Sequence, residues 1–181
     1  MTLTHGHGLT IEDLEAMPDD GRRYELIGGS IVVNASPAPR HQIALGNLNQ
    51  LVRAACPAGH TTIFSPIDLD LPGPQRVEPD LVVVPDASIG PKRLCLPVLL
   101  LVELVSPTSV HWDLVIKRDA YAEAGVPHYW TIDTREGHED FIAWQLEPGA
   151  DRYEAAITSA DRIDVILPVA VSTSLDDLFT P

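Results

Sequence analysis

Aliphatic runs in the middle of the chain predict the central strands of a buried β-sheet. Leu81–Val84 and Val98–Val105 are nearly continuous, and His128–Asp133 follows as a third strand candidate. Strands of this kind are covered on both faces. Between the second and third runs, apolar residues recur at helical spacing from a capping serine, Ser109, to a terminating glycine, Gly125. The order strand, helix, strand predicts a crossover that joins two parallel strands.

Shorter elements are predicted on either side of this unit. Gly28-Gly29 separates two β-prone runs and indicates a tight hairpin, and apolar residues at helical spacing predict a helix over residues 41–55. The other predicted elements are short helices at 10–14 and 174–178, and strands at 61–64, 67–71, 141–145 and 153–158. A chain of 181 residues can bury a core of its own, so we expect a single domain over residues 1–181.

Three charged residues interrupt the otherwise apolar elements. Asp80 opens the first aliphatic run, Glu103 lies inside the second, and Lys117 falls in the apolar stripe of the helix together with Leu114 and Tyr121. A lysine in such a stripe must either extend to solvent or be held by a negative partner. The three residues therefore predict one buried charged site, although buried ion pairs that serve only the structure have the same pattern.

These residue types suit the hydrolysis of a phosphodiester. Carboxylates on neighbouring central strands converge, and two or three of them can hold a divalent ion that neutralises phosphoryl oxygens and activates water. A nearby lysine can position or deprotonate that water, or stabilise developing negative charge. Asp80, Glu103 and Lys117 supply these groups. In the alternative interpretation, Asp80 caps a turn after Pro79, and Glu103 and Lys117 form a structural pair.

Six segments in order carry a family resemblance. They are Tyr24–Gly29, Ser36–His41, Glu78–Leu81, Val102–Pro107, Asp113–Tyr121 and Ala124–Trp130. As a set they resemble the Uma-type restriction endonuclease family of the PD-(D/E)XK nuclease superfamily, over roughly residues 10–135. The resemblance implies an α/β, restriction-endonuclease-like core: a central mixed sheet flanked by helices, with an N-terminal hairpin and a C-terminal antiparallel extension.

The same resemblance implies an activity and a metal. DNA is the implied substrate, and Mg²⁺, with Mn²⁺ as an alternative, is implied at Asp80 and Glu103. Glu25 is implied as a further acidic contributor, although a strand position of this kind can point either inward or to solvent. In most of the superfamily the lysine lies two residues after the acidic residue, where this chain has Val105. The Uma-type pattern instead supplies it from the following helix, as Lys117.

Three more side chains are candidates near this site. His41 stands at a predicted helix N-terminus and could contact a phosphate, since helix N-termini favour anions, but an exposed histidine is the simpler interpretation. Asp113 lies one turn before Lys117 and can hold it as an i,i+4 partner. Tyr121, one turn after Lys117, could hydrogen-bond the site or fill the core, and we expect it to fill the core.

The charge of the chain weighs on the choice of function. A net charge of −14 argues against a broad electrostatic grip on nucleic acid or on an anionic membrane, and leaves room only for a local basic groove. It therefore favours two alternatives to a DNA nuclease. One is a catalytically weak or inactive module that binds nucleic acid or protein, and the other is a phosphohydrolase of small nucleotides.

Location and assembly follow from smaller signals. Cys56 and Cys95 match neither a disulfide framework nor a zinc pattern, so we expect buried thiols in a reducing cytoplasm. No apolar stretch reaches the length of a membrane span, no secretory signal is visible, and His5 and His7 are expected to be inert. A homodimer is expected because duplex DNA presents two strands related by two-fold symmetry.

Overall fold

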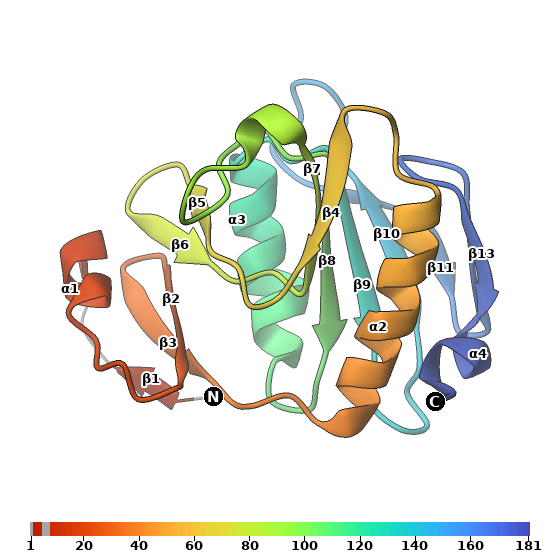
Figure 1. The fold of residues 1–181 in the computed structure, drawn as a ribbon, viewed down its shortest axis with the longest axis horizontal. Helices are drawn as coiled ribbons and strands as arrows, with labels where there is room; N and C mark the ends of the chain where they lie inside the picture. Colours follow the sequence, from red (N-terminus) through yellow and green to blue (C-terminus); the bar gives the residue numbers. More distant parts are fainter. Residues whose placement is uncertain (1, 5–7) are drawn as a thin grey trace.

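The centre of the molecule is a six-stranded sheet with the strand order β11-β10-β9-β8-β7-β4, which Figure 1 shows. The structure, a computed structural model, describes residues 2–4 and 8–181, so His5 and His7 lie outside the described residues. Strands β8 and β9 are parallel, and the other neighbouring pairs are antiparallel. The predicted mixed sheet and the predicted crossover are therefore confirmed. The strands are β4 His60–Phe64, β7 Leu81–Pro85, β8 Leu100–Val105, β9 His128–Asp133, β10 Phe141–Gln145 and β11 Glu154–Ser159.

A second, five-stranded sheet has the order β1-β3-β2-β6-β5. Its strands are β1 Thr2–Thr4, β2 Arg23–Ile27, β3 Ser30–Asn34, β5 Leu69–Leu71 and β6 Gln75–Val77. The predicted hairpin, β2 with β3, lies at its centre. Its tight turn is possible because Gly28 and Gly29 have positive φ angles, 55° and 71°, which only glycine adopts readily. The sequence did not predict that three separated segments would join in one sheet, since β1, β5 and β6 have three residues each.

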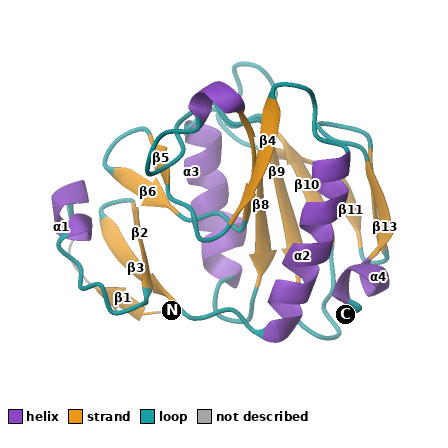
Figure 2. Ribbon diagram, viewed as in Figure 1, coloured by secondary structure: helices purple, strands orange, loops and turns teal. Residues whose placement is uncertain are grey.

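Helices cover both faces of the six-stranded sheet (Figure 2). The described helical elements are α1 Ile11–Glu15, which packs on β2 of the five-stranded sheet, α2 Pro39–Ala54, the short 3₁₀ turn η1 Asp86–Ser88, the π-helical stretch η2 Trp112–Lys117, α3 Arg118–Glu123 and α4 Leu175–Phe179. Helices α2 and α4 pack on one face, and α3 packs on the other. Helix α2 begins two residues before the predicted start, with Pro39 in the first turn, where its missing N–H costs nothing.

Strand alternation decides which side chains meet which helix. In β8, Leu100 and Val102 belong to the core beneath α2, whereas Leu101 belongs to the core beneath α3. Successive side chains of a strand point to opposite faces, so Glu103 lies on the α3 face. The continuous aliphatic composition of β7 and β8 has the same cause, because both of their faces are covered.

The C-terminal part extends the sheet and then folds over it. Strands β10 and β11 form the predicted antiparallel pair. An additional hairpin, β12 Arg162–Val165 with β13 Val171–Ser174, was not predicted, and it packs on the α2 face through Ile163 and Val171. Cys95 is exposed and Cys56 is half-buried, so the expectation of two buried thiols is wrong for Cys95 and holds only in part for Cys56. Among the described residues, no helix has the length and apolar character needed to cross a membrane.

Candidate active site

Asp80 and Glu103 come together at the junction of two neighbouring strands. Asp80 immediately precedes β7, and the antiparallel register pairs Leu81 with Val102, so the next pair along is Asp80 and Glu103. Their exposed fractions are only 6% and 3%. The predicted placement of the two carboxylates at adjacent central strands is confirmed.

Lys117 reaches the two carboxylates from the end of the π-helical stretch η2. Its Nζ lies 2.9 Å from Glu25 Oε1, 3.0 Å from Glu103 Oε1 and 4.0 Å from Asp113 Oδ1. One ammonium group therefore faces three carboxylates, and all four side chains are buried. Burying a charge is costly unless it is paired, and here the lysine offsets part of the repulsion among the acids.

A π-helical stretch presents Lys117 and Asp113 to the sheet. The sequence pattern predicts that Leu114 and Tyr121 face the sheet on a regular helix. In the structure Asp113, Lys117 and Tyr121 are the buried positions, while Leu114 is only half-buried. Residues four apart share a face in a π turn as they do in a regular helix, but the wider turn moves Leu114, three residues before Lys117, away from that face. Asp113 thus becomes the expected i,i+4 partner of Lys117, at the long end of an ion-pair distance.

Glu25 points inward from β2, as one of the two interpretations of the sequence required. It is 1% exposed. Besides its contact with Lys117, its two oxygens accept hydrogen bonds from the Asn34 side chain and from the backbone N–H of Glu78, each at 2.6 Å. Glu25 therefore joins the five-stranded sheet to the charged cluster and is held in one orientation by neutral donors.

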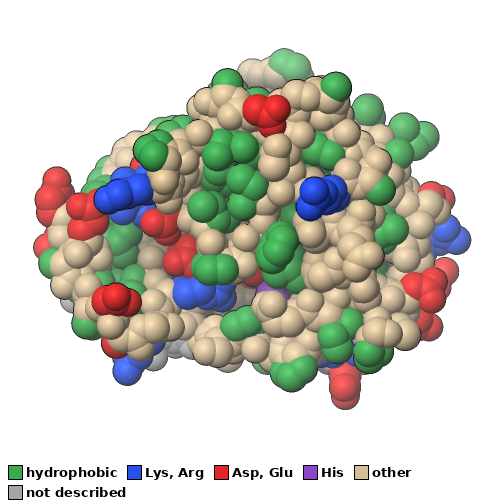
Figure 3. All heavy atoms as spheres, in the orientation of Figure 1, with side chains coloured by type: hydrophobic (Ala, Val, Ile, Leu, Met, Phe, Trp, Pro, Cys, Tyr) green, Lys and Arg blue, Asp and Glu red, His purple; other side chains and the backbone are tan. Residues whose placement is uncertain are grey.

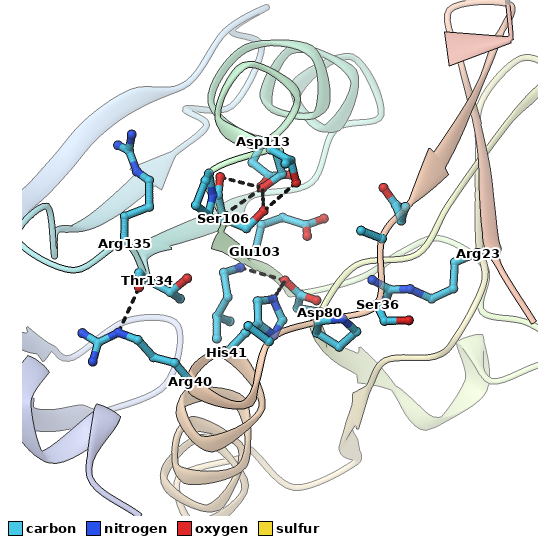
Figure 4. A pocket seen from close by; sticks show the side chains of 18 of the residues that line it. Arg23, Ser36, Arg40, His41, Asp80, Glu103, Ser106, Asp113, Thr134 and Arg135 are labelled. Carbon is cyan, nitrogen blue, oxygen red and sulfur yellow. Dashed lines mark hydrogen bonds and ion pairs between the residues drawn. The ribbon is translucent and has the colours of Figure 1, made fainter. Parts of the chain in front are cut away.

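His41 is buried rather than exposed, so the simpler interpretation of this residue was wrong. It is 8% exposed, and its Nε2 lies 3.2 Å from Asp80 Oδ2 (Figure 4). Its spacing contains the signal for this burial, because Leu45, Leu48 and Val52 continue the same helical stripe and are all buried. Among the described residues, its other ring nitrogen has no hydrogen-bond partner.

Asp80 is held in an ionised state by its donors. Burial alone would raise the pKa of Asp80, but the hydrogen bond from His41, the charge of that ring and the N–H of Leu104 hold it below its usual value. The Leu104 N–H donates to Asp80 Oδ2 over 2.8 Å. Both donors use the same oxygen. Asp80 Oδ1 accepts no hydrogen bond from the described residues.

Tyr121 fills the core and also hydrogen-bonds the site. Its ring is fully buried, and its hydroxyl donates to Glu103 Oε1 over 2.7 Å. The two interpretations of Tyr121 are therefore both correct. Glu103 Oε1 receives hydrogen bonds from Tyr121 and Lys117, whereas Glu103 Oε2 receives none from the described residues.

The cluster raises the pKa values of two acids, Glu103 and Asp113, and of the lysine between them. Burial raises the pKa of Glu103 well above its usual value, although the Lys117 ammonium opposes that rise. Burial alone would lower the pKa of Lys117, but Glu103, Glu25 and Asp113 raise it well above its usual value. Burial also raises the pKa of Asp113 to about 7, again against the effect of Lys117. Lys117 therefore remains protonated at neutral pH.

The carboxylates line a cavity of about 580 Å³. Figure 3 shows acidic, basic and histidine side chains meeting in a recess between the two sheets. The walls come from three segments, residues 35–38, 106–109 and 134–136, and the lining includes Arg23, Arg40 and Arg135. Parts of two walls, and Arg40, lie in segments that carry the family resemblance, but sequence reasoning assigned no role in the site to the walls or to the arginines. They lie in connecting segments or next to them, where no periodicity marks a residue as functional.

The donor set fits a magnesium ion that is shared with a substrate. Among the described residues, no three His, Cys, Asp or Glu side chains are grouped so as to hold a metal by themselves. Asp80 and Glu103 nevertheless each keep one oxygen free of hydrogen bonds, and both line the cavity. Magnesium is commonly bound by one or two carboxylates, with water and substrate phosphates completing its octahedron. Two anchored carboxylates in an open cavity meet that requirement.

Comparisons with known proteins relate the chain to nucleases. Residues 11–174 match the model of a family, Uma2, whose description is "Putative restriction endonuclease". The fold is similar to that of a crystal structure from Anabaena variabilis described as "a putative nuclease belonging to DUF820". The two chains are 15% identical with a TM-score of 0.70, over 94% of this chain and 97% of the other. No curated protein matches the chain. The α/β, restriction-endonuclease-like fold is confirmed.

Proposed function

The chain belongs to the Uma2 family, and from this premise we propose that it is a magnesium-dependent nuclease that hydrolyses DNA phosphodiester bonds. One observation carries the proposal. Asp80 and Glu103 each have one oxygen fixed by protein donors and the other free, and both line one cavity. A purely structural cluster has no need of two free carboxylate oxygens at a cavity wall.

In this proposal Asp80 and Glu103 hold the metal. When bound, the ion neutralises charge on the phosphoryl oxygens and lowers the pKa of a bound water. The protein's own part is orientation. His41 and the Leu104 N–H fix Asp80, while Tyr121 and Lys117 fix Glu103. Carboxylates that are held in place before substrate arrives lose little freedom on binding.

Lys117 acts as a fixed positive charge in this scheme. Because its pKa is raised well above the usual value, it does not accept a proton from water at neutral pH. Its charge opposes the rise in the pKa of Glu103, and it lies in the wall of the cavity where charge develops on the phosphoryl group. Glu25 acts through Lys117, as its second anchor.

Magnesium dependence tests the proposal. Wild-type protein should hydrolyse bis(p-nitrophenyl) phosphate, a small phosphodiester, only with Mg²⁺ or Mn²⁺, and Asp80→Asn should lower the rate about 10²-fold or more, because a metal ligand is lost. The same ions should raise the melting temperature of the wild type, because they bind only the folded state. The rise should vanish in Asp80→Asn and persist in Asp151→Asn, a change at an exposed aspartate.

Two results would count against the proposal. Metal-independent hydrolysis would remove the role of the carboxylates as ligands. A melting temperature that Mg²⁺ raises equally in Asp80→Asn and in the wild type would place the ion elsewhere.

One observation favours a second candidate, a module that binds nucleic acid without cleaving it. Lys117 and Tyr121 already occupy Glu103 Oε1, so this carboxylate is partly neutralised before any metal arrives. A protein that binds labelled DNA but shows no metal-dependent hydrolysis of any phosphodiester would match this candidate.

A further inference from the structure

The cavity with the carboxylates continues into a neighbouring hollow. A second hollow of about 380 Å³ lies beside it, and its lining includes Gly21, Arg22 and Val33. The two share Arg23 and the segment Asn34–Pro37 as lining. The two hollows therefore adjoin along the connector between β3 and α2, and together they form one path that leads from the carboxylates toward the exposed side chain of Arg22.

Arginines stand on both sides of the carboxylates along this path. In Figure 4, Asp80 and Glu103 lie between Arg23 on one side and Arg40 and Arg135 on the other. Each arginine is held by the protein. Arg23 donates to Ser65 Oγ over 2.8 Å, Arg40 to the Thr134 carbonyl over 2.9 Å, and Arg135 to Asp133. Each guanidinium keeps at least one nitrogen that none of these contacts uses, since arginine has five N–H groups.

This arrangement points to the form of the substrate. We propose that the path takes one single strand of nucleic acid, with the scissile phosphate at the carboxylates and the flanking phosphates at the arginines on either side. The reaction in this statement rests on the proposed nuclease function. The choice of a single strand over a duplex is additional to it, and it rests on the shape and charge of the path.

The depth of the carboxylates argues against a duplex. Asp80 and Glu103 are almost fully buried and lie behind walls formed by three connecting segments. In a duplex the phosphates lie on a stiff cylinder with stacked base pairs behind them, and they approach a recessed site poorly. A single strand has free backbone torsions and unstacked bases. It can place one phosphate at the bottom of the cavity and rest a sugar or base against Pro37 and Pro107 in its walls.

The charge of the molecule agrees with a short, local contact. The chain carries a net charge of −14, so a broad duplex footprint would meet repulsion on most surfaces. Positive charge along the path comes from Lys117 and from four arginines, Arg22, Arg23, Arg40 and Arg135, each of which is also paired with a carboxylate. With only two or three phosphates contacted, affinity should depend weakly on salt. A plot of the logarithm of the association constant against the logarithm of the salt concentration should have a slope of about −0.7 per neutralised phosphate for a single strand.

Binding tests the inference independently of hydrolysis. The probe is a fluorescein-labelled oligonucleotide without self-complementarity, used alone and annealed to its complement, with fluorescence anisotropy as the readout in the absence of divalent ions. The single strand should bind at least about tenfold more tightly than the duplex. Equal affinity, or tighter binding of the duplex, would overturn the inference.

Variants at the second hollow locate the binding. Arg22 lines only that hollow, and its side chain is 65% exposed, so Arg22→Glu should fold normally. It should weaken single-strand binding about tenfold at low salt, as expected when one phosphate contact becomes a repulsion. Asp20→Asn should change affinity in the opposite direction, because Asp20 lies 3.3 Å from Arg22 and competes with a phosphate.

The control is Arg152→Glu, a charge reversal at an exposed arginine in the loop before β11. It should leave binding unchanged, and equal losses in Arg22→Glu and Arg152→Glu would overturn the inference. Hydrolysis of bis(p-nitrophenyl) phosphate should be unchanged in Arg152→Glu, because Arg152 lines neither hollow. Failure of the wild type to hydrolyse this diester would count against the nuclease function, whereas the strand preference is read from binding alone.

Discussion

At the scale of single residues, Lys117 bears on both the stability of the protein and its proposed activity. Its ammonium faces Glu25, Glu103 and Asp113, so Lys117→Met should leave three buried carboxylates without a counter-charge. The expected loss is about 3–5 kcal/mol in the free energy of unfolding, typical when one partner of a buried pair is removed. Urea unfolding without metal measures it. Mg²⁺ should recover part of the loss.

The matched control is Arg118→Met, at the neighbouring residue, whose partner Asp119 is exposed. It should cost less than about 1 kcal/mol, as exposed ion pairs do. Equal stability of Lys117→Met and the wild type would show that the carboxylates do not need this lysine. The structure counts against that outcome, because three carboxylates rather than one or two depend on the ammonium.

Asp113 gives the protein a pH dependence with a definite sign. Burial raises its pKa to about 7 in the folded state, with Asp80 and Glu25 adding to the rise and Lys117 and Ser109 opposing it, against about 3.9 in an unfolded chain. Between these values the folded state binds more protons. The stabilising contribution of the protonated form is complete below about pH 4 and is lost as pH rises through about 7.

Urea unfolding between pH 5 and pH 8 should therefore show stability falling with pH, by up to about 1.4 kcal/mol per pH unit from this one group. Asp113→Asn should flatten that slope. Asp119→Asn, at an exposed position on the next turn, should keep it. A slope that survives in Asp113→Asn would assign the protons to another group.

At the scale of elements, much of the structure could be predicted from the sequence. The aliphatic runs fixed β7 and β8, and the crossover pattern correctly placed β8 parallel to β9. With Asp80 at the start of one strand and Glu103 inside the next, their meeting followed from sheet geometry alone. The π-helical stretch Trp112–Lys117 could not be predicted, because its residues have the same helical periodicity as an ordinary helix. Its effect is to bury Asp113 in place of Leu114.

At the scale of the whole molecule, no pattern in the sequence predicted that two sheets meet at the site. The five-stranded sheet assembles short strands from three separated segments, and strands of three residues leave no clear periodic signal. The cavity walls and Arg135 escaped prediction for a related reason. They belong to loops, whose positions are set by the elements that they connect.

Assembly is a further prediction at this scale. We propose a homodimer, and β11 offers a place for a second copy, because it is a sheet edge whose residues Glu154–Thr158 are exposed. Sedimentation should then give twice the chain mass of 19.7 kDa. A mass that stays at 19.7 kDa over a wide concentration range would contradict the dimer. The dimer proposal rests on this exposed edge, because a single-stranded substrate has no two-fold symmetry for the enzyme to match.

The contact of Glu25 and Glu103 with the ammonium group of Lys117 also has a consequence for the synthesis of the protein. The three residues come from the first sheet, the second sheet and the helix that follows it, so the ribosome must release about two-thirds of the chain before they can meet. A nascent or prematurely terminated chain that lacks the helix leaves both acids without their cation. A chain that is still being translated therefore cannot assemble the charged cluster until the helix that carries Lys117 has been made.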